Sequence, residues 1–300
     1  MKTVLVTGAS GFVAGHVARR LKEDGVRIVG TSRSAESVES FDRVYPARLG
    51  ESLAAVFSGE SIDVVVHAAN HAGDDEYEIN YSGTRRWFEE ARTAGVGLQI
   101  LLSSLSASPS AVSGYGRAKY ALEELFTSHD AVAYRLGVVI GNGGMFARIR
   151  DSVAAGPLVP LLDGGTSRVF IQGIDFLCDV IQECVTANGE GLRARVWNLQ
   201  QPSPVTLRVL MDSIRRQYGY RCRFLPVPSL PVLWVLTLAE KLRVRLPVNT
   251  TNVRGLREGR TEVFGSDYAL FGHREYTLEE LIEKTMDGMS PTRSAGGVTQ

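Results

Sequence analysis

The sequence has few cysteines and no excess of charge of either sign, and both features exclude some classes of protein. Its three cysteines, Cys178, Cys184 and Cys222, form no CxxC pair. A disulfide framework or a zinc site is therefore not expected, and a reducing compartment suits the chain. Lysine plus arginine and aspartate plus glutamate both number 33, so the formal net charge is zero. A neutral chain argues against nucleic acid as a bulk electrostatic partner.

Long apolar runs are also missing. The N-terminal run stops at Gly8, too early for a signal peptide, and we interpret it as a strand. The longest apolar stretch, residues 225–239, contains three prolines and falls short of the ~20 residues of a membrane span. We therefore expect a cytoplasmic protein without membrane association. Residues 230–245 join an apolar run to a basic end and could rest on a membrane surface, although packing on the core is favoured.

The first half of the chain contains a regular alternation of strand and helix patterns. Continuous apolar or β-branched runs predict strands at residues 2–7, 26–31, 63–67, 99–103 and 131–140, with weaker ones at 41–45 and 195–199. Apolar residues at helical spacing predict helices at residues 12–23, 82–94 and 116–128. This order predicts an α/β protein with a Rossmann-type, doubly wound parallel sheet, whose ligands bind beyond the carboxyl ends of the strands.

Glycine and proline interrupt the alternation from about residue 141. We therefore expect a dinucleotide-binding domain at residues 1–140 and a smaller, mostly helical substrate lobe at residues 141–287. Strands near residues 195–200 are expected to return from that lobe to the sheet. The small, polar segment 288–300 is expected to be a disordered tail.

A glycine-rich turn (TGASGFVAG, residues 7–15) follows the first predicted strand and opens the first predicted helix. Gly8 and Gly11 would let the backbone approach a diphosphate at the positive end of that helix. Ala14 replaces the third glycine of the usual pattern. That position governs close packing of the helix on the strand, and alanine is tolerated there. The turn therefore predicts a dinucleotide site.

The end of the second predicted strand bears on which dinucleotide is bound. Enzymes that prefer NAD usually place an acid there for the ribose 2′-hydroxyl, but this chain has Thr31, Ser32, Arg33 and Ser34. No acid would repel a 2′-phosphate, and the planar guanidinium of Arg33 could pair with one. The sequence favours NADP(H), with NAD(H) as the alternative; a solvated loop arginine is the other interpretation of Arg33.

Three residue types after the fifth predicted strand suit hydride-transfer chemistry. Tyr115 and Lys119 lie four positions apart, so a helix places them on one face, and Ser103 and Ser104 precede them. A nearby ammonium and an oxidised nicotinamide ring favour phenolate, so we expect the pKa of Tyr115 to lie below its usual ~10. The tyrosine could then exchange a proton with a substrate oxygen that a serine hydroxyl polarises.

These motifs occur together and in order: TGASGFVAG, DVVVHAA at residues 63–69, Asn80 with Gly83-Thr84, LLSSLSA and YGRAK. Over roughly residues 1–285 the chain resembles the extended short-chain dehydrogenase/reductases, and most of all their NAD-dependent epimerase/dehydratase branch, which includes nucleotide-sugar enzymes. The resemblance implies that Tyr115 is the acid/base and Lys119 its ribose-binding partner. It also implies that the serine that polarises the substrate oxygen is Ser104, with Ser103 as the alternative.

The turn, the second strand and the resemblance together predict a cofactor site. Its residues are Gly8, Ser10, Gly11, Phe12, Val13, Ser32, Arg33, His67, Ala68, Ala69, Ser103, Lys119, Gly137 and Val138. No metal site is predicted, because the histidines have no ligand spacing and residues 74–78 are interpreted as an acidic surface loop.

The leading hypothesis is an NADP(H)-dependent oxidoreductase or epimerase that transfers hydride at a secondary alcohol or ketone of a nucleotide-linked sugar. One alternative is a reductase of a small non-sugar carbonyl compound. Another is a non-catalytic sensor or assembly protein that binds dinucleotide without turnover. Since relatives often dimerise through a four-helix interface that includes the helix of Tyr115 and Lys119, a homodimer also stays open.

Overall fold

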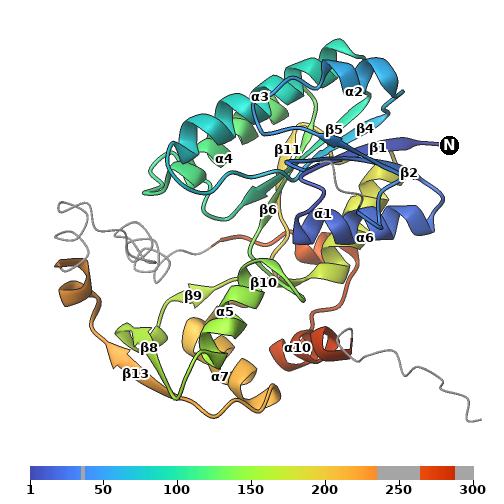
Figure 1. Ribbon diagram of the computed structural model, residues 1–300. Coiled ribbons are helices and arrows are strands. Elements are labelled where there is room, and N and C mark those ends of the chain that lie inside the picture. Colours follow the sequence, from blue (N-terminus) through green and yellow to red (C-terminus); the bar gives the residue numbers. More distant parts are fainter. Residues whose placement is uncertain (35–37, 235–263, 288–300) are drawn as a thin grey trace, which may run out of the picture.

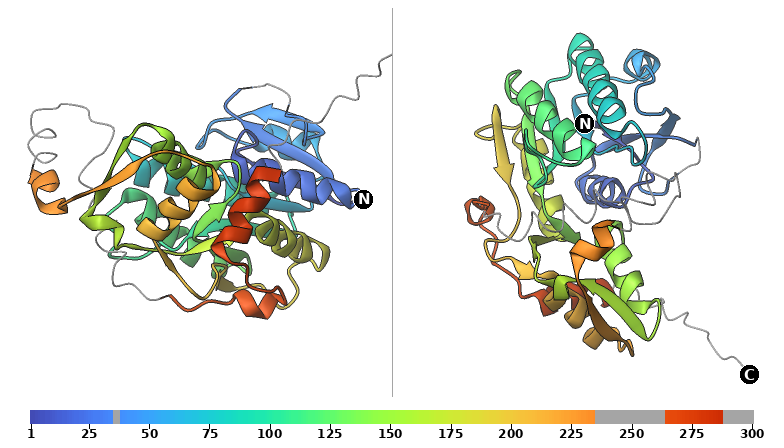
Figure 2. Two further views of the ribbon diagram at one scale, coloured as in Figure 1. Left: turned by 90° about the horizontal axis from the view of Figure 1, so that it is seen from below. Right: turned by 90° about the vertical axis from the view of Figure 1, so that its left-hand side faces the viewer.

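The computed structural model describes residues 1–34, 38–234 and 264–287. Residues 1–136 and 174–198 form a parallel sheet between two layers of helices, and most of the rest of the second half packs beneath one end of that sheet (Figure 1). The right-hand view of Figure 2 shows the two parts one above the other. The last predicted segment, the tail at residues 288–300, lies outside the described residues.

Seven strands form the central sheet in the order β11-β6-β5-β4-β1-β2-β3, and every neighbouring pair is parallel. This confirms the predicted Rossmann-type α/β fold. Strand order reverses between β1 and β4, so the carboxyl ends of these two strands flank the switch point where such sheets bind ligands. The strands are β1 Thr3–Thr7, β2 Arg27–Ser32, β3 Arg43–Pro46, β4 Val64–His67, β5 Leu98–Ser104, β6 Val132–Leu136 and β11 Arg195–Asn198.

Helices cover both faces of the sheet because alternate strand residues point to opposite sides. Val4 and Val6 pack with α1 (Phe12–Glu23) and α6 (Ile174–Thr186) in one core cluster. Leu5 points the other way and packs with Trp87 of α3 (Glu76–Thr93). Helices α4 (Gly114–Thr127) and the short α2 (Ala54–Gly59) lie on that second side with α3 (Figure 1).

The second half combines helices with small sheets around a core of its own. The lobe was expected to be mostly helical, and three two-stranded sheets add to its helices. The strands are β7 Val138–Ile140, β8 Leu158–Leu162, β9 Arg168–Val169, β10 Ile171–Gly173, β12 Val205–Thr206 and β13 Arg223–Val227. The helices are α5 Gly144–Ala154, α7 Leu207–Gln217, α10 Leu278–Asp287 and the 3-10 turns η1 Asp163–Gly165 and η2 Tyr268–Phe271.

Two predicted elements differ from the structure. The strand predicted at residues 131–140 divides at Gly137, where β6 stays in the main sheet and β7 leaves to pair with β10. Gly137 N–H is held by Gln172 Oε1 at 2.9 Å, and a Cβ on Gly137 would lie 2.3 Å from Phe170 O. The helix predicted from residue 82 begins earlier, at Glu76, behind Asp75 in a left-handed conformation with φ 57°.

The described residues contain no helix long and apolar enough to cross a membrane. Of the stretch predicted as a helix at residues 230–245, only residues 230–234 are described. Leu230 and Trp234 are exposed, so the favoured expectation that this stretch packs on the core is wrong for these two side chains. The remaining residues of that prediction lie outside the described part.

Candidate active site

The glycine-rich turn lies at the switch point between β1 and β4. Gly8 has φ +77°, and a Cβ there would lie 3.0 Å from Ala69 Cα, so only glycine fits without strain. The turn closes by a hydrogen bond from Gly11 N–H to Gly8 O at 2.8 Å. Thr7 Oγ1 accepts from the N–H groups of Ala68 and Ala69, both at 3.0 Å, which ties the end of β1 to the end of β4.

The first turn of α1 is built to receive an anion. Its N-cap is Gly11, which has no side chain to accept from the first N–H groups of the helix. Phe12, beside Val13 in that turn, is covered by the loop 141–144, where a Cβ on Gly143 would lie 2.4 Å from its ring. Ala14 is buried at the helix–sheet contact, as the predicted close packing requires. These features fit the diphosphate of a dinucleotide.

The end of β2 places Ser32 and Arg33 next to the turn. Ser32 is buried, and its hydroxyl donates to Ser10 Oγ at 3.4 Å. Arg33 is exposed and forms no ion pair or hydrogen bond with the described part of the chain. No carboxylate stands between residues 31 and 34, so the described residues at the end of β2 supply a cation without an ion-pair partner.

His67 ends β4 within the sheet and does not face solvent. Its Nε2 lies 2.8 Å from Gln99 Oε1, and its ring packs edge-on against Phe126 at 5.0 Å between centroids. Burial lowers its pKa from 6.5 to about 4. The imidazole is therefore a neutral structural group, and only the backbone of residues 67–69 borders the cofactor turn.

Ser103 and Ser104 end β5 but have different surroundings. Ser103 is buried and donates to Glu123 Oε1 at 2.5 Å. The same carboxylate accepts hydrogen bonds from Arg135 Nε at 2.9 Å and from Arg135 Nη2 at 2.7 Å. Ser104 instead opens to the cleft described below, where its hydroxyl influences the pKa of Tyr115 and accepts from Ser106 N–H at 3.2 Å and Ser106 Oγ at 3.0 Å. Of the two serines, only Ser104 has its hydroxyl beside the tyrosine.

Helix α4 brings Tyr115 and Lys119 together, as their spacing predicts. Lys119 Nζ lies 5.6 Å from the centroid of the Tyr115 ring and donates to Leu102 O at 2.7 Å. The helix begins at Gly114 because Ser113 accepts from Gly116 N–H at 3.0 Å, a side-chain cap. A Cβ on Gly116 would lie 2.4 Å from Ser106 O, so this helix start packs tightly on the loop after β5.

The electrostatics of this pair differ from the sequence-based expectation. Burial raises the pKa of Tyr115 to about 12, with a lowering by the Ser104 hydroxyl and a further raising by the charge of Glu76. Burial also lowers the pKa of Lys119 to about 8, opposed by the charge of Glu123. The expected lowering of the tyrosine pKa is therefore not produced by the chain's own groups, because loss of hydration outweighs the effect of Ser104.

A cleft of ≈ 1090 Å³ lies between the two halves and opens over Ser104 and Tyr115. Gly137 and Val138 line it from the point where β6 gives way to β7. Two of its arginines, Arg148 and Arg168, are exposed and form no ion pair within the described ranges. The apolar residues that line the cleft are Leu105, Leu136, Met145, Val169, Phe170 and Phe264.

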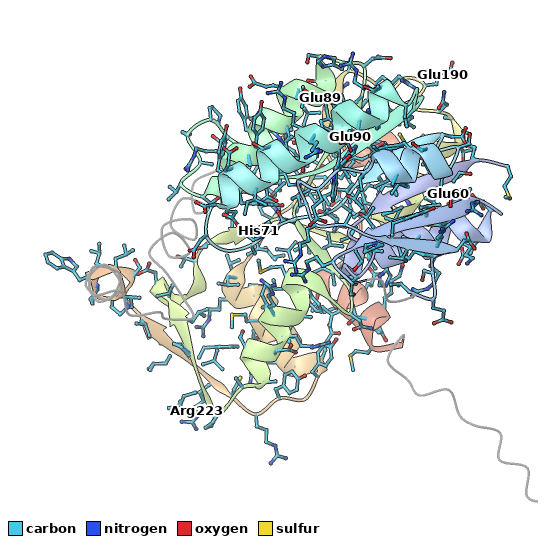
Figure 3. All side chains as sticks on the ribbon, turned by 45° about the horizontal axis from the view of Figure 1, so that its top comes forward. Glu60, His71, Glu89, Glu90, Glu190 and Arg223 are labelled. Atoms are coloured by element: carbon cyan, nitrogen blue, oxygen red, sulfur yellow. The ribbon has the colours of Figure 1, made fainter. Side chains whose placement is uncertain are left out.

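Sequence reasoning missed two carboxylates that position this site. Glu123, four residues after Lys119 on the same helix face, could have been found from that spacing. Glu76 lies far away in sequence but accepts from Tyr115 N–H at 3.0 Å and so fixes the start of α4. Buried Asn80 holds the loop before Glu76 by accepting from His71 N–H and donating to His71 O, both at 2.8 Å. His71 lies where the two halves face each other (Figure 3).

The stretch at residues 74–78, predicted as an acidic surface loop, is a loop only up to Asp75 because Glu76 starts α3, and Asp74, Asp75 and Glu76 line the cleft. Within the described part of the chain, no three histidine, cysteine or acidic side chains gather in a way that could hold a metal ion. Cys178 and Cys184 are buried in α6, where they pack as small apolar side chains.

Comparison with known proteins agrees with this geometry. The chain is 32% identical over 286 residues to ceramide reductase from Caulobacter vibrioides, covering 88% of this chain and 85% of that protein. It is 26% identical over 261 residues to UDP-glucose 4-epimerase from Mycolicibacterium smegmatis, covering 72% of this chain and 82% of that protein.

Among solved structures, the fold is similar to UDP-glucose 4-epimerase from Thermotoga maritima bound to UDP-glucose. The TM-score is 0.71 at 18% identity, with 96% of this chain and 100% of that one covered. The model of the NAD dependent epimerase/dehydratase family matches residues 4–177, which include the turn, the serines, Tyr115 and Lys119. The chain therefore belongs to the NAD-dependent epimerase/dehydratase family of extended short-chain dehydrogenase/reductases, and is an enzyme that uses a nicotinamide dinucleotide.

Proposed function

We propose that the enzyme is an NADP(H)-dependent oxidoreductase that reduces a ketone to a secondary alcohol on a nucleotide-linked sugar. The observation that carries this proposal is the placement of the Ser104 and Tyr115 hydroxyls in one cleft, beside the buried ammonium of Lys119. A bound nicotinamide dinucleotide supplies the hydride to the ketone carbon.

Tyr115 gives its phenolic proton to the ketone oxygen as that oxygen gains negative charge. A pKa of about 12 keeps the phenol protonated at neutral pH, which supports the reductive direction. Ser104 donates a hydrogen bond to the same oxygen and so stabilises the developing charge. Lys119 remains largely protonated near pH 7, since its pKa is about 8, and has donors beyond the one used by Leu102 O to hold ribose hydroxyls.

The cofactor preference rests on the end of β2. Ser32 and Arg33 offer a hydroxyl and a guanidinium, and no acid of the described part of the chain pairs with that guanidinium. A 2′-phosphate accepts charge-assisted hydrogen bonds from such a pair, whereas a bare 2′-hydroxyl gains little from the arginine. The rest of the cofactor seat is formed by the turn from Gly8 to Val13 and by the backbone of Ala68 and Ala69, within residues 1–140.

The substrate class rests on the charge of the cleft. Arg148 and Arg168 come from the second half, residues 141–287, and face the same space as Tyr115. Exposed guanidinium groups without carboxylate partners suit the diphosphate of a nucleotide-linked sugar, and the M. smegmatis relative is a UDP-glucose 4-epimerase. The second half then acts as the substrate lobe.

A reductase of a non-sugar ketone is the second candidate function. The apolar lining of the cleft, which includes Met145 and Phe170, suits a substrate with a hydrophobic part. The relative from C. vibrioides, whose similarity extends over most of both chains, is a ceramide reductase. Both candidates use the same Ser104, Tyr115 and Lys119 and differ only in what the cleft selects.

A substrate panel separates the two functions. Oxidation of NADPH is followed with keto forms of nucleotide-linked sugars and with long-chain ketones, using wild type and an Arg148→Ser, Arg168→Ser double variant. The proposal predicts turnover of a nucleotide-linked sugar with KM at least about tenfold higher in the double variant. Turnover of long-chain ketones alone, unchanged in the double variant, would assign the second function instead.

A further inference from the structure

The small sheet formed by β8 and β13 has an unusual outer face. The strands pair in parallel, with Leu158 opposite Arg223 and Pro160 opposite Leu225. Since paired residues point to the same side and successive residues alternate, one face carries Val159, Leu161 and Phe224, which belong to the core of the second half. The opposite face carries Leu158, Pro160, Leu162, Arg223, Leu225 and Val227.

That outer face is apolar and open. Leu158 is 62% exposed and Leu225 is 53% exposed, and they are diagonal neighbours across the strand pair. The chain that leaves β13 continues with Leu230, 59% exposed, and Trp234, 79% exposed. Figure 1 places β8, β13 and this continuation together at the outer edge of the second half. Single exposed leucines are common, but a contiguous set marks a contact surface.

Basic residues border the same face. Arg221 and Arg223 are exposed at the start of β13, and Arg223 projects from the outer edge of the molecule (Figure 3). Neither arginine forms an ion pair within the described residues. These two exposed guanidinium groups give the edge of the apolar face a positive charge, although the whole chain has zero formal net charge.

We propose that this apolar face, with its basic border, docks the enzyme on an anionic membrane surface. Leucine and tryptophan side chains enter the headgroup region while arginines remain at the level of the lipid phosphates, an arrangement typical of peripheral binding. A second copy is a poorer partner, because a two-fold contact places each face against itself and brings the like charges of both copies together. The proposal is independent of which substrate the cleft takes.

The test is flotation of the full chain with vesicles of phosphatidylglycerol and phosphatidylcholine, compared with vesicles of phosphatidylcholine alone. We expect flotation with the anionic vesicles, weakened by salt and by Arg223→Glu. A Leu158→Ser, Leu225→Ser double variant should lower the fraction bound at least about tenfold. The matched control is Leu270→Ser on η2, a leucine that is 69% exposed and outside the proposed face. Thermal unfolding checks that each variant folds, as expected for exposed positions.

Failure of the wild type to float with either vesicle overturns the proposal, as does an equal loss of binding in Leu270→Ser. Analytical ultracentrifugation without vesicles tests whether a second copy of the chain binds this face instead, because it measures the oligomeric state. A dimer that the Leu158→Ser, Leu225→Ser variant dissociates, in a protein that does not float, assigns the face to a second copy instead.

Discussion

Ser103 donates a 2.5 Å hydrogen bond to Glu123, whose carboxylate also receives two hydrogen bonds from Arg135. The network joins the end of β5, the middle of α4 and the end of β6 on the side of the sheet where Tyr115 lies. It satisfies a buried carboxylate and leaves the neighbouring Ser104 free to face the cleft. The two adjacent serines therefore differ in what their loss should do.

Replacing each serine by alanine separates their roles. Ser104→Ala should lower kcat about tenfold to a hundredfold with little change in stability, because it removes a donor to the substrate oxygen. Ser103→Ala should lower the free energy of unfolding by about 1–2 kcal/mol, because it removes one of the three hydrogen bonds to a buried carboxylate. Steady-state kinetics and urea unfolding of both variants check this. A larger kcat loss in Ser103→Ala than in Ser104→Ala would reverse the assignment.

Acid should destabilise the fold through His67. Its folded-state pKa of about 4 lies below 6.5, so the unfolded state binds the proton first as the pH falls. Stability is therefore lost between pH 6.5 and about 4, by at most about 3 kcal/mol. Urea unfolding at several pH values should show this loss in wild type and in His129→Gln, an exposed histidine control. His67→Gln should flatten the curve; an unchanged curve contradicts the argument.

Arg33 should decide between the two dinucleotides. Arg33→Ser is expected to weaken NADPH binding about tenfold or more and leave NADH binding nearly unchanged, since only the 2′-phosphate interacts with the guanidinium. Fluorescence titration of wild type, Arg33→Ser and the exposed control Arg85→Ser measures both affinities. Tighter binding of NADH than of NADPH by the wild type would show that this cation does not select the cofactor.

Lys119 should matter for activity and little for folding. A buried ammonium with a pKa near 8 is held in the folded chain at a cost, so Lys119→Met should keep or raise thermal stability. The same change should lower kcat about a hundredfold or more and weaken dinucleotide binding, because the donor to the ribose is lost. Calorimetry and kinetics on one preparation test both parts. Full activity in Lys119→Met would remove the lysine from the site.

The sequence predicted the parts of the site that depend on local pattern. The turn at Gly8, the helix at residues 12–23 and the spacing of Tyr115 and Lys119 are short-range features, and the structure contains them where expected. The break between β6 and β7 at Gly137 was not predicted, because the two strands form one continuous apolar run in the sequence. The break depends on contacts of Gly137 with Gln172 and Phe170, over thirty residues later.

Side-chain contacts and burial in the folded chain also explain the remaining errors. Helix α3 begins at Glu76 because Asn80 holds the preceding loop, a pairing that no helical periodicity reveals. The raised pKa of Tyr115 follows from burial in the folded cleft, which the spacing of residues does not show. Whether Leu230 and Trp234 face the core or solvent likewise depends on how β13 packs, and an apolar run is compatible with either.

Deuterium transfer tests the central claim, that Tyr115 supplies the proton while hydride moves from the dinucleotide. The measurement uses NADPH deuterated at the transferred position of C4, the substrate found in the panel, and mass spectrometry of the product. Wild type and the control Tyr120→Phe, a partly exposed tyrosine on the same helix, should give alcohol that carries one deuterium. Tyr115→Phe should bind NADPH normally and form product at least about a hundredfold more slowly. Product without deuterium, or equal rates in Tyr115→Phe and Tyr120→Phe, would contradict the account.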